Sequence, residues 1–163
     1  MIVSSAIEKM IAFYQGNLHD INHFLKVWAF AKTIGEQEGL DGQTQLTLEL
    51  AAVVHDIACP LCRQKYGNAN GKYQELESPP LVEDFFAGMP VERDMAERIS
   101  WLVAHHHTYR VDGLDYQILL EADFLVNADE GGLARAAIEN MRQSVFRTGA
   151  GIRLLDSIYL REQ

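Results

Sequence analysis

His55 and Asp56 stand side by side directly after the apolar run Leu50–Val54 and are followed by another apolar residue, Ile57. Residues in such a setting are expected inside a folded core. There, a histidine and a carboxylate are costly to desolvate unless something compensates them. A bound divalent cation is a natural compensation. The fold is then expected to bring further ligands for that cation, from elsewhere in the chain, to residues 55 and 56.

Apolar residues recur at helical spacing along most of the chain, and no segment alternates as a strand does. Asp20 is expected to cap a helix that Gly39 ends. Helices are predicted at about 5–14, 20–38, 43–56, 74–87, 91–107, 114–128, 133–146 and 151–160, and an irregular stretch at about 59–73. The fold class is therefore all-α, a single-domain irregular bundle of about six to eight helices.

The length of 163 residues fits one domain, 1–163, with a core at about 20–127 and a helical C-terminal extension at 130–163. A net charge of −9 argues against nucleic-acid polymers as partners and leaves small phosphorylated molecules open. We expect no membrane partner and a cytoplasmic location, because the sequence shows neither a long apolar span nor a signal sequence. A homo-oligomer is left open.

Two residues at other places in the chain are the best additional ligands. His23 lies on the preceding helical pattern and Asp123 on a later one, in the run Leu119–Leu125. Together with His55 and Asp56 they make a mixed nitrogen and oxygen set, which suits Mn²⁺, Fe²⁺, Co²⁺, Ni²⁺, Zn²⁺ or, less readily, Mg²⁺. Such an ion favours hydrolysis of a phosphate ester. The spacing alone also allows four separate core or surface residues.

The order His23, His55-Asp56, Asp123 resembles the signature of the HD-domain superfamily of metal-dependent phosphohydrolases. Three contexts carry the resemblance: residues 20–27, 51–57 and 121–125. Lys65-Tyr66-Gly67 and the segment 71–75 are similar to a subgroup of small bacterial HD proteins. The resemblance implies an all-α fold and one or two divalent cations per chain, bound by those four residues. It also implies substrates that are often nucleotides or other phosphate esters.

Further catalytic candidates surround the predicted ion. In many HD proteins a His-His pair near the position of His105-His106-His107 binds a second metal or contacts the phosphate. Members with two metals usually have a further histidine where this chain reads Gln74-Glu75-Leu76-Glu77, which puts a second ion in doubt. The catalytic candidates are Asp56, Lys26, His105, His106 and Glu77, with Glu75, Lys65, Lys72 and Arg110 as weaker ones. Each can also be an ordinary solvated residue.

Three functions from different classes remain open. The leading hypothesis is a metal-dependent phosphohydrolase that acts on a small phosphorylated substrate. The alternatives are a metal- or nucleotide-binding regulatory module with little catalytic activity and a two-metal oxygenase, which the missing histidine disfavours. Cys59 and Cys62 form a C-x-x-C pair that follows a predicted helix rather than a strand. This context disfavours a redox centre, and two thiols supply only half of a four-thiolate zinc site.

Overall fold

The structure is a computed structural model that describes residues 1–110 and 112–162. These residues form nine helices and no strand, which confirms the all-α fold class. The helices are α1 (Ile2–Phe13), α2 (Leu18–Gln37), α3 (Gly42–Val54), α4 (Cys59–Tyr66), α5 (Gly71–Phe86), α6 (Arg93–His105), α7 (Gly113–Glu130), α8 (Arg135–Ser144) and α9 (Gly149–Tyr159).

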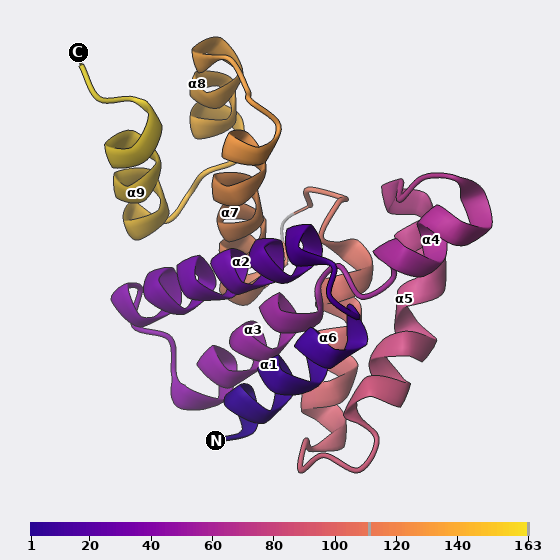
Figure 1. Ribbon diagram of the computed structural model, residues 1–163. Coiled ribbons are helices and arrows are strands. Elements are labelled where there is room, and N and C mark those ends of the chain that lie inside the picture. The colour runs from indigo at the N-terminus through magenta and orange to yellow at the C-terminus, as the bar shows by residue number, and fades with distance from the viewer. Residues whose placement is uncertain (111, 163) are drawn as a thin grey trace.

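α3 is enclosed by other helices of the bundle. It contacts α1, α2, α6 and α7, and every residue from Thr47 to Val54 is buried. α2 packs along both α3 and α7, whereas α5 packs on α6 and carries α4 at its other side (Figure 1). The C-terminal end of α3 therefore faces residues of α2, α6 and α7 inside the core.

The C-terminal helices α8 and α9 form a pair beside α7 (Figure 1). The buried carboxylate of Glu121 on α7 holds this pair against α7. It accepts hydrogen bonds from the Thr148 hydroxyl (2.7 Å), the Gln117 amide (2.7 Å) and the backbone N–H groups of Arg147 and Thr148 (both 3.3 Å). Gly151 fits closely against the same carboxylate, since a Cβ there would lie 2.0 Å from Glu121 Oε1.

Two local predictions are wrong. Asn17, not Asp20, caps α2, because its side chain accepts from the Asp20 backbone N–H. Asp20 lies inside the first turn and pairs with Arg63. The stretch predicted as irregular at 59–73 contains α4 and the start of α5. Pro60 is tolerated because it lies in the first turn of α4, where the backbone N–H has no helical partner, and Gly67 ends that helix at φ 76°.

The segment Gly42–Tyr66 is long and apolar enough to cross a membrane by length and composition alone. However, 72% of its most apolar window is buried inside the protein. Such burial is what the central helix of a folded domain shows, so this segment is accounted for by the core.

Candidate metal centre

The backbone turn after α3 brings His55 and Asp56 to the same point. α3 ends at Val54 with His55 as its C-cap, and α4 begins only at Cys59. Neighbouring residues inside a helix point about 100° apart, whereas here His55 Nε2 and Asp56 Oδ2 are 3.5 Å apart. The predicted helix end at this pair is confirmed, and it is what allows the two side chains to converge.

α2 and α7 supply two more side chains to this point. His23 Nε2 lies 3.1 Å from His55 Nε2 and 3.3 Å from Asp56 Oδ2. Asp123 Oδ1 lies 3.3 Å from His23 Nε2 and 3.4 Å from His55 Nε2. The structure thus brings together all four residues proposed as ligands, although their binding of an ion stays a prediction.

His106, the C-cap of α6, adds a fifth side chain. Its Nε2 lies 3.3 Å from Asp56 Oδ1. The two oxygens of Asp56 therefore face different partners: Oδ2 faces His23 and His55, and Oδ1 faces His106. Of these five side chains Asp56 is the most accessible, at 23% exposure, so its side of the cluster is the open one.

In each of the three histidines, a hydrogen bond made by Nδ1, the ring nitrogen that points away from the cluster, fixes the orientation of the ring. His55 Nδ1 donates to the Ala52 carbonyl and His106 Nδ1 to the Val103 carbonyl, both at 2.7 Å. Because a carbonyl only accepts, Nδ1 carries the hydrogen, and Nε2 of a neutral ring presents a lone pair to the cluster. His23 Nδ1 is likewise bound to Glu130 Oε2 at 2.8 Å. Three Nε2 atoms with fixed orientation therefore face two carboxylates.

The cluster is strongly coupled electrostatically. Burial would lower the pKa of His23, but the carboxylates of Asp123, Asp56 and Glu130 outweigh burial and raise it to about 9. Burial would raise the pKa of Asp56, yet the neighbouring His55 and His106 hold it well below its usual range. His23 and His55 do the same for Asp123 against its own burial. Both carboxylates are therefore ionised and require positive charge beside them.

The residues present fit a divalent cation. Asp123 Oδ1 and His106 Nε2 are buried and have no hydrogen-bond partner among the described residues. Unpartnered buried polar atoms are rare because they cost free energy, and a bound ion is one of their ordinary explanations. His23, His55 and Asp123 offer ligand atoms within 4.8 Å of one another, as do His55, Asp56 and His106. Imidazole and carboxylate ligands suit the transition metals predicted from the sequence.

Three other catalytic candidates lie away from the cluster. Lys26 is exposed and lines a groove with Phe30, Asp129 and Tyr159, between α2, α7 and α9. His105 stacks on Trp101 with ring centroids 4.4 Å apart, and its Nε2 faces Glu75 at 3.5 Å.

Glu77 also points elsewhere. Its Oε1 accepts from Lys65 Nζ at 2.6 Å and from the Tyr66 hydroxyl at 2.5 Å, so it joins α5 to α4. Sequence reasoning placed these residues on the right helices but not on the faces that reach the centre. A spacing of three residues, as between His23 and Lys26, leaves two side chains on one side of a helix without bringing them to the same point.

Glu130 belongs to the site but was not singled out from the sequence, whereas Gln74 and His107 were named only as members of the segments 74–77 and 105–107. Glu130 lies seven residues after Asp123, two turns along the same face of α7, and this spacing is the signal that could have identified it. Gln74 Nε2 lies 3.1 Å from His107 Nε2. Burial and the adjacent His106 lower the pKa of His107 to about 4.

Cys59 and Cys62 are both buried and are not disulfide-bonded. Burial raises the pKa of the Cys59 thiol, and the nearby Asp56 carboxylate raises it further. Burial likewise raises the pKa of Cys62. Thiolates rather than thiols are metal ligands and nucleophiles, so the physical setting of this pair agrees with a packing role.

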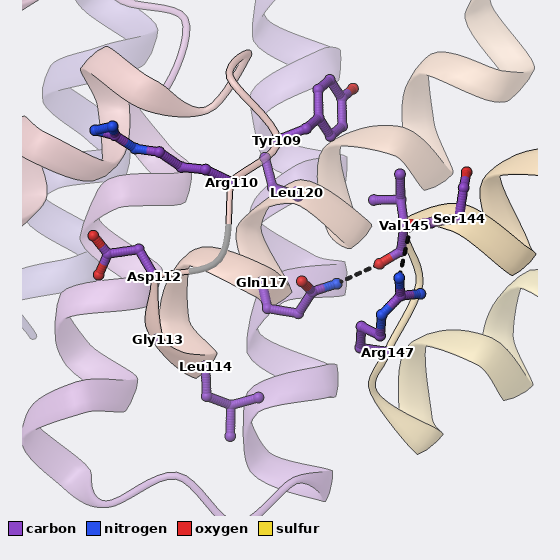
Figure 2. Close-up of a pocket in the computed structure, with 10 residues that line it drawn as sticks. All are labelled: Tyr109, Arg110, Asp112, Gly113, Leu114, Gln117, Leu120, Ser144, Val145 and Arg147. Carbon is purple, nitrogen blue, oxygen red and sulfur yellow. Dashed lines mark hydrogen bonds between the residues drawn. The ribbon is translucent and has the colours of Figure 1, made fainter.

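A cavity of about 520 Å³ lies between the loop after α6, α7 and the end of α8, and its lining lacks residues of the centre. Tyr109 belongs to its lining and follows His107 by two residues; burial and then Asp123 raise the pKa of the Tyr109 hydroxyl. Figure 2 shows the opposite wall, at the end of α8, where Gln117 donates to the Val145 carbonyl at 2.8 Å. A larger cavity of about 800 Å³ lies between α5 and α6, and no residue of the centre lines it.

Comparison with known proteins gives a family for the chain. The family model of the HD domain matches residues 20–130, which include every residue of the centre. No curated protein and no solved structure matched the chain significantly. HD domains bind divalent metals and are generally hydrolases. Because the match covers more than half of its length, the chain belongs to the HD-domain family.

Proposed function

We propose that this protein is a divalent-metal-dependent phosphohydrolase acting on a small phosphorylated molecule, a nucleotide or another phosphate ester, in the cytoplasm. The observation that carries the proposal is the convergence of five side chains from four separate parts of the fold. His23, His55, Asp56, His106 and Asp123 present nitrogen and carboxylate oxygen atoms to one another at 3.1–3.5 Å. Two of those atoms are buried without a hydrogen-bond partner among the described residues.

His23, His55, Asp56 and Asp123 would hold the ion. When bound, a divalent ion supplies Lewis acidity toward a phosphoryl oxygen and lowers the pKa of water. The histidines keep Nε2 available because their other nitrogens are engaged. Rings held in this way need no reorganisation when a ligand arrives.

Asp56 and His106 are the residues best placed to handle a proton. Asp56 Oδ1 and His106 Nε2 lie 3.3 Å apart, and Asp56 is the most accessible of the five side chains. A carboxylate and an imidazole at this separation can share a proton removed from a nucleophilic water, and an imidazolium there stabilises negative charge on a phosphoryl oxygen. We therefore assign general-base and charge-stabilising roles to this pair.

The size and charge of the protein support a small substrate. A net charge of −9 disfavours binding of a nucleic-acid polymer. The charge of a single phosphate, in contrast, needs only a few positive groups close to it. The cavity of about 520 Å³ beside Tyr109 is within the size range of small-molecule sites. We propose that it receives the part of the substrate beyond the phosphate, while the phosphate itself reaches the centre.

The test combines metal analysis with a phosphatase screen. Purified protein should contain a transition metal and hydrolyse at least one member of a panel of nucleotides and sugar phosphates. Asp56→Ala should abolish this activity, a loss of at least about 10²-fold, while the helical circular dichroism spectrum stays unchanged.

Lys26→Ala is the matched control, because Lys26 is exposed on α2 and contacts a different groove. It should retain activity. Unchanged turnover in Asp56→Ala would end the proposed mechanism. Tight binding of a metal and a nucleotide without turnover across the panel would instead identify a regulatory module.

A further inference from the structure

A second group of potential ligands overlaps the centre. His106, His107 and Asp123 offer ligand atoms that all lie within 4.8 Å of one another. His106 and Asp123 also belong to the centre described above, and His107 is the additional member. By distance alone, this group would take a second ion next to the first.

Gln74 determines whether His107 can be a ligand. Gln74 is buried in the first turn of α5, and its Nε2 lies 2.8 Å from the Ala69 carbonyl and 3.1 Å from His107 Nε2. The Ala69 carbonyl only accepts, so the nitrogen of the amide has to be the atom at this position. Its second hydrogen then points to His107 Nε2, which must accept it. The hydrogen-bond network therefore assigns the hydrogen of the neutral His107 ring to Nδ1.

The surroundings keep the His107 ring in place. A Cβ on Gly71 would lie 2.9 Å from His107 Cβ and 3.3 Å from His107 Cγ, so α5 approaches the ring as closely as a glycine permits. On its other side the ring lies against His106, with centroids 3.8 Å apart. With the ring between α5 and His106, turning its nitrogens away from Gln74 would give up the hydrogen bond to Gln74.

In this arrangement neither nitrogen of His107 is free to bind a metal. The lone pair of Nε2 accepts from Gln74, and Nδ1 carries the hydrogen. Binding through Nδ1 would move the hydrogen to Nε2, where it would face the Gln74 N–H at 3.1 Å. Turning the amide would relieve that conflict but would place Gln74 Oε1 against the Ala69 carbonyl.

On the basis of the metal centre proposed above, we propose that Gln74 excludes His107 from the coordination sphere, so that the centre holds a single ion. Gln74 is then a positioning residue that acts through the tautomer of His107. The inference also separates this chain from two-metal oxygenase chemistry, which needs a second ion beside the first.

Metal content measures the inference directly. Protein saturated with Mn²⁺, freed of excess metal and analysed by mass spectrometry should contain a single ion per chain. Gln74→Leu removes the amide and with it the N–H that occupies His107 Nε2. Either nitrogen of His107 can then present a lone pair, so the variant should take up a second ion, doubling the metal content. The double variant Gln74→Leu with His107→Ala should return to a single ion.

Glu75→Gln is the matched control, because this neighbour on α5 faces His105 and not His107. It should keep the wild-type metal content. Two ions in the wild type, one ion in Gln74→Leu, or two in the double variant would each overturn the inference.

The tautomer can also be read without any variant. Imidazole ¹⁵N shifts of His107 in the wild type loaded with diamagnetic Zn²⁺ should show hydrogen on Nδ1, and hydrogen on Nε2 would overturn the inference even if Gln74→Leu failed to fold. Neither measurement requires turnover. A wild type that binds no divalent ion would refute the proposed function, whereas one that binds two would refute only the single-ion centre.

Discussion

Glu130 lies outside the ligand group, yet it decides which nitrogen of His23 faces the centre. His23 Nδ1 donates to Glu130 Oε2 at 2.8 Å, which leaves Nε2 for the cluster. His55 and His106 obtain the same orientation from backbone carbonyls, which no side-chain substitution removes. His23 is therefore the one of these three histidines whose orientation depends on a side chain.

Removing Glu130 should weaken metal binding without unfolding the protein. We expect Glu130→Ala to lower metal affinity about 10- to 100-fold, the usual effect of losing the partner that orients a ligating histidine. Glu130→Gln should lose less, because its amide oxygen still accepts from Nδ1–H. Competition with a chelating dye measures the affinity, and Glu139→Ala, an exposed glutamate of α8, is the control. Equal affinity in wild type and Glu130→Ala would show that His23 needs no partner.

At the scale of the helices, Glu121 joins α7 to the α8–α9 pair, and its contribution to the free energy of unfolding depends on pH. Its carboxylate is buried, and burial raises its pKa above the ordinary value of 4.5 despite hydrogen bonds from Gln117 and Thr148. A group with a raised pKa in the folded state favours folding in its protonated form. This contribution is present below the unfolded pKa and is lost as pH rises through the folded pKa.

Glu121→Gln keeps the shape of this contact and removes its ionisation. The free energy of unfolding of the variant relative to the wild type should therefore increase as pH rises from about 4.5 toward neutrality. Urea denaturation at several pH values measures this difference, with Glu97→Gln, an exposed position on α6, as the control for the change of charge. A difference that does not vary with pH would mean that the Glu121 carboxylate ionises as easily folded as unfolded.

At the scale of the whole molecule, the sequence predicted most of the helices and the four proposed ligands, and it missed α4. Helical periodicity predicted the all-α fold, and a histidine-aspartate pair inside an apolar run marked the end of α3. Lys26 was chosen for its spacing from His23, and His105 and Glu77 for the resemblance, but the faces they occupy depend on how helices pack. Contacts such as His23–Glu130, 107 residues apart, arise only in the folded chain.

The centre also links stability to metal, because it joins α2, α3, α6 and α7 through ionised carboxylates. Without a cation, the ionised carboxylates of Asp56 and Asp123 lie close together in a buried cluster. Among the described residues, the positive charge that lowers their pKa values comes from protonated histidines. A metal that binds only the folded chain stabilises it by about 2.7 kcal/mol at one hundred times its Kd. For a chain of this size that corresponds to a rise in Tm of roughly 5–10 °C.

Calorimetry with a chelator and then with excess Mn²⁺ should show this rise in the wild type. In Asp123→Asn the response should be much smaller, because the variant loses a charged ligand while its amide still fills the same space beside His23 and His55. The same comparison shows what the buried charge costs in the absence of metal, where Asp123→Asn should equal or exceed the wild type in Tm. If the wild-type Tm changes with neither chelator nor Mn²⁺, or if Asp123→Asn shows an equal shift, the five side chains pack together for a reason other than a shared cation.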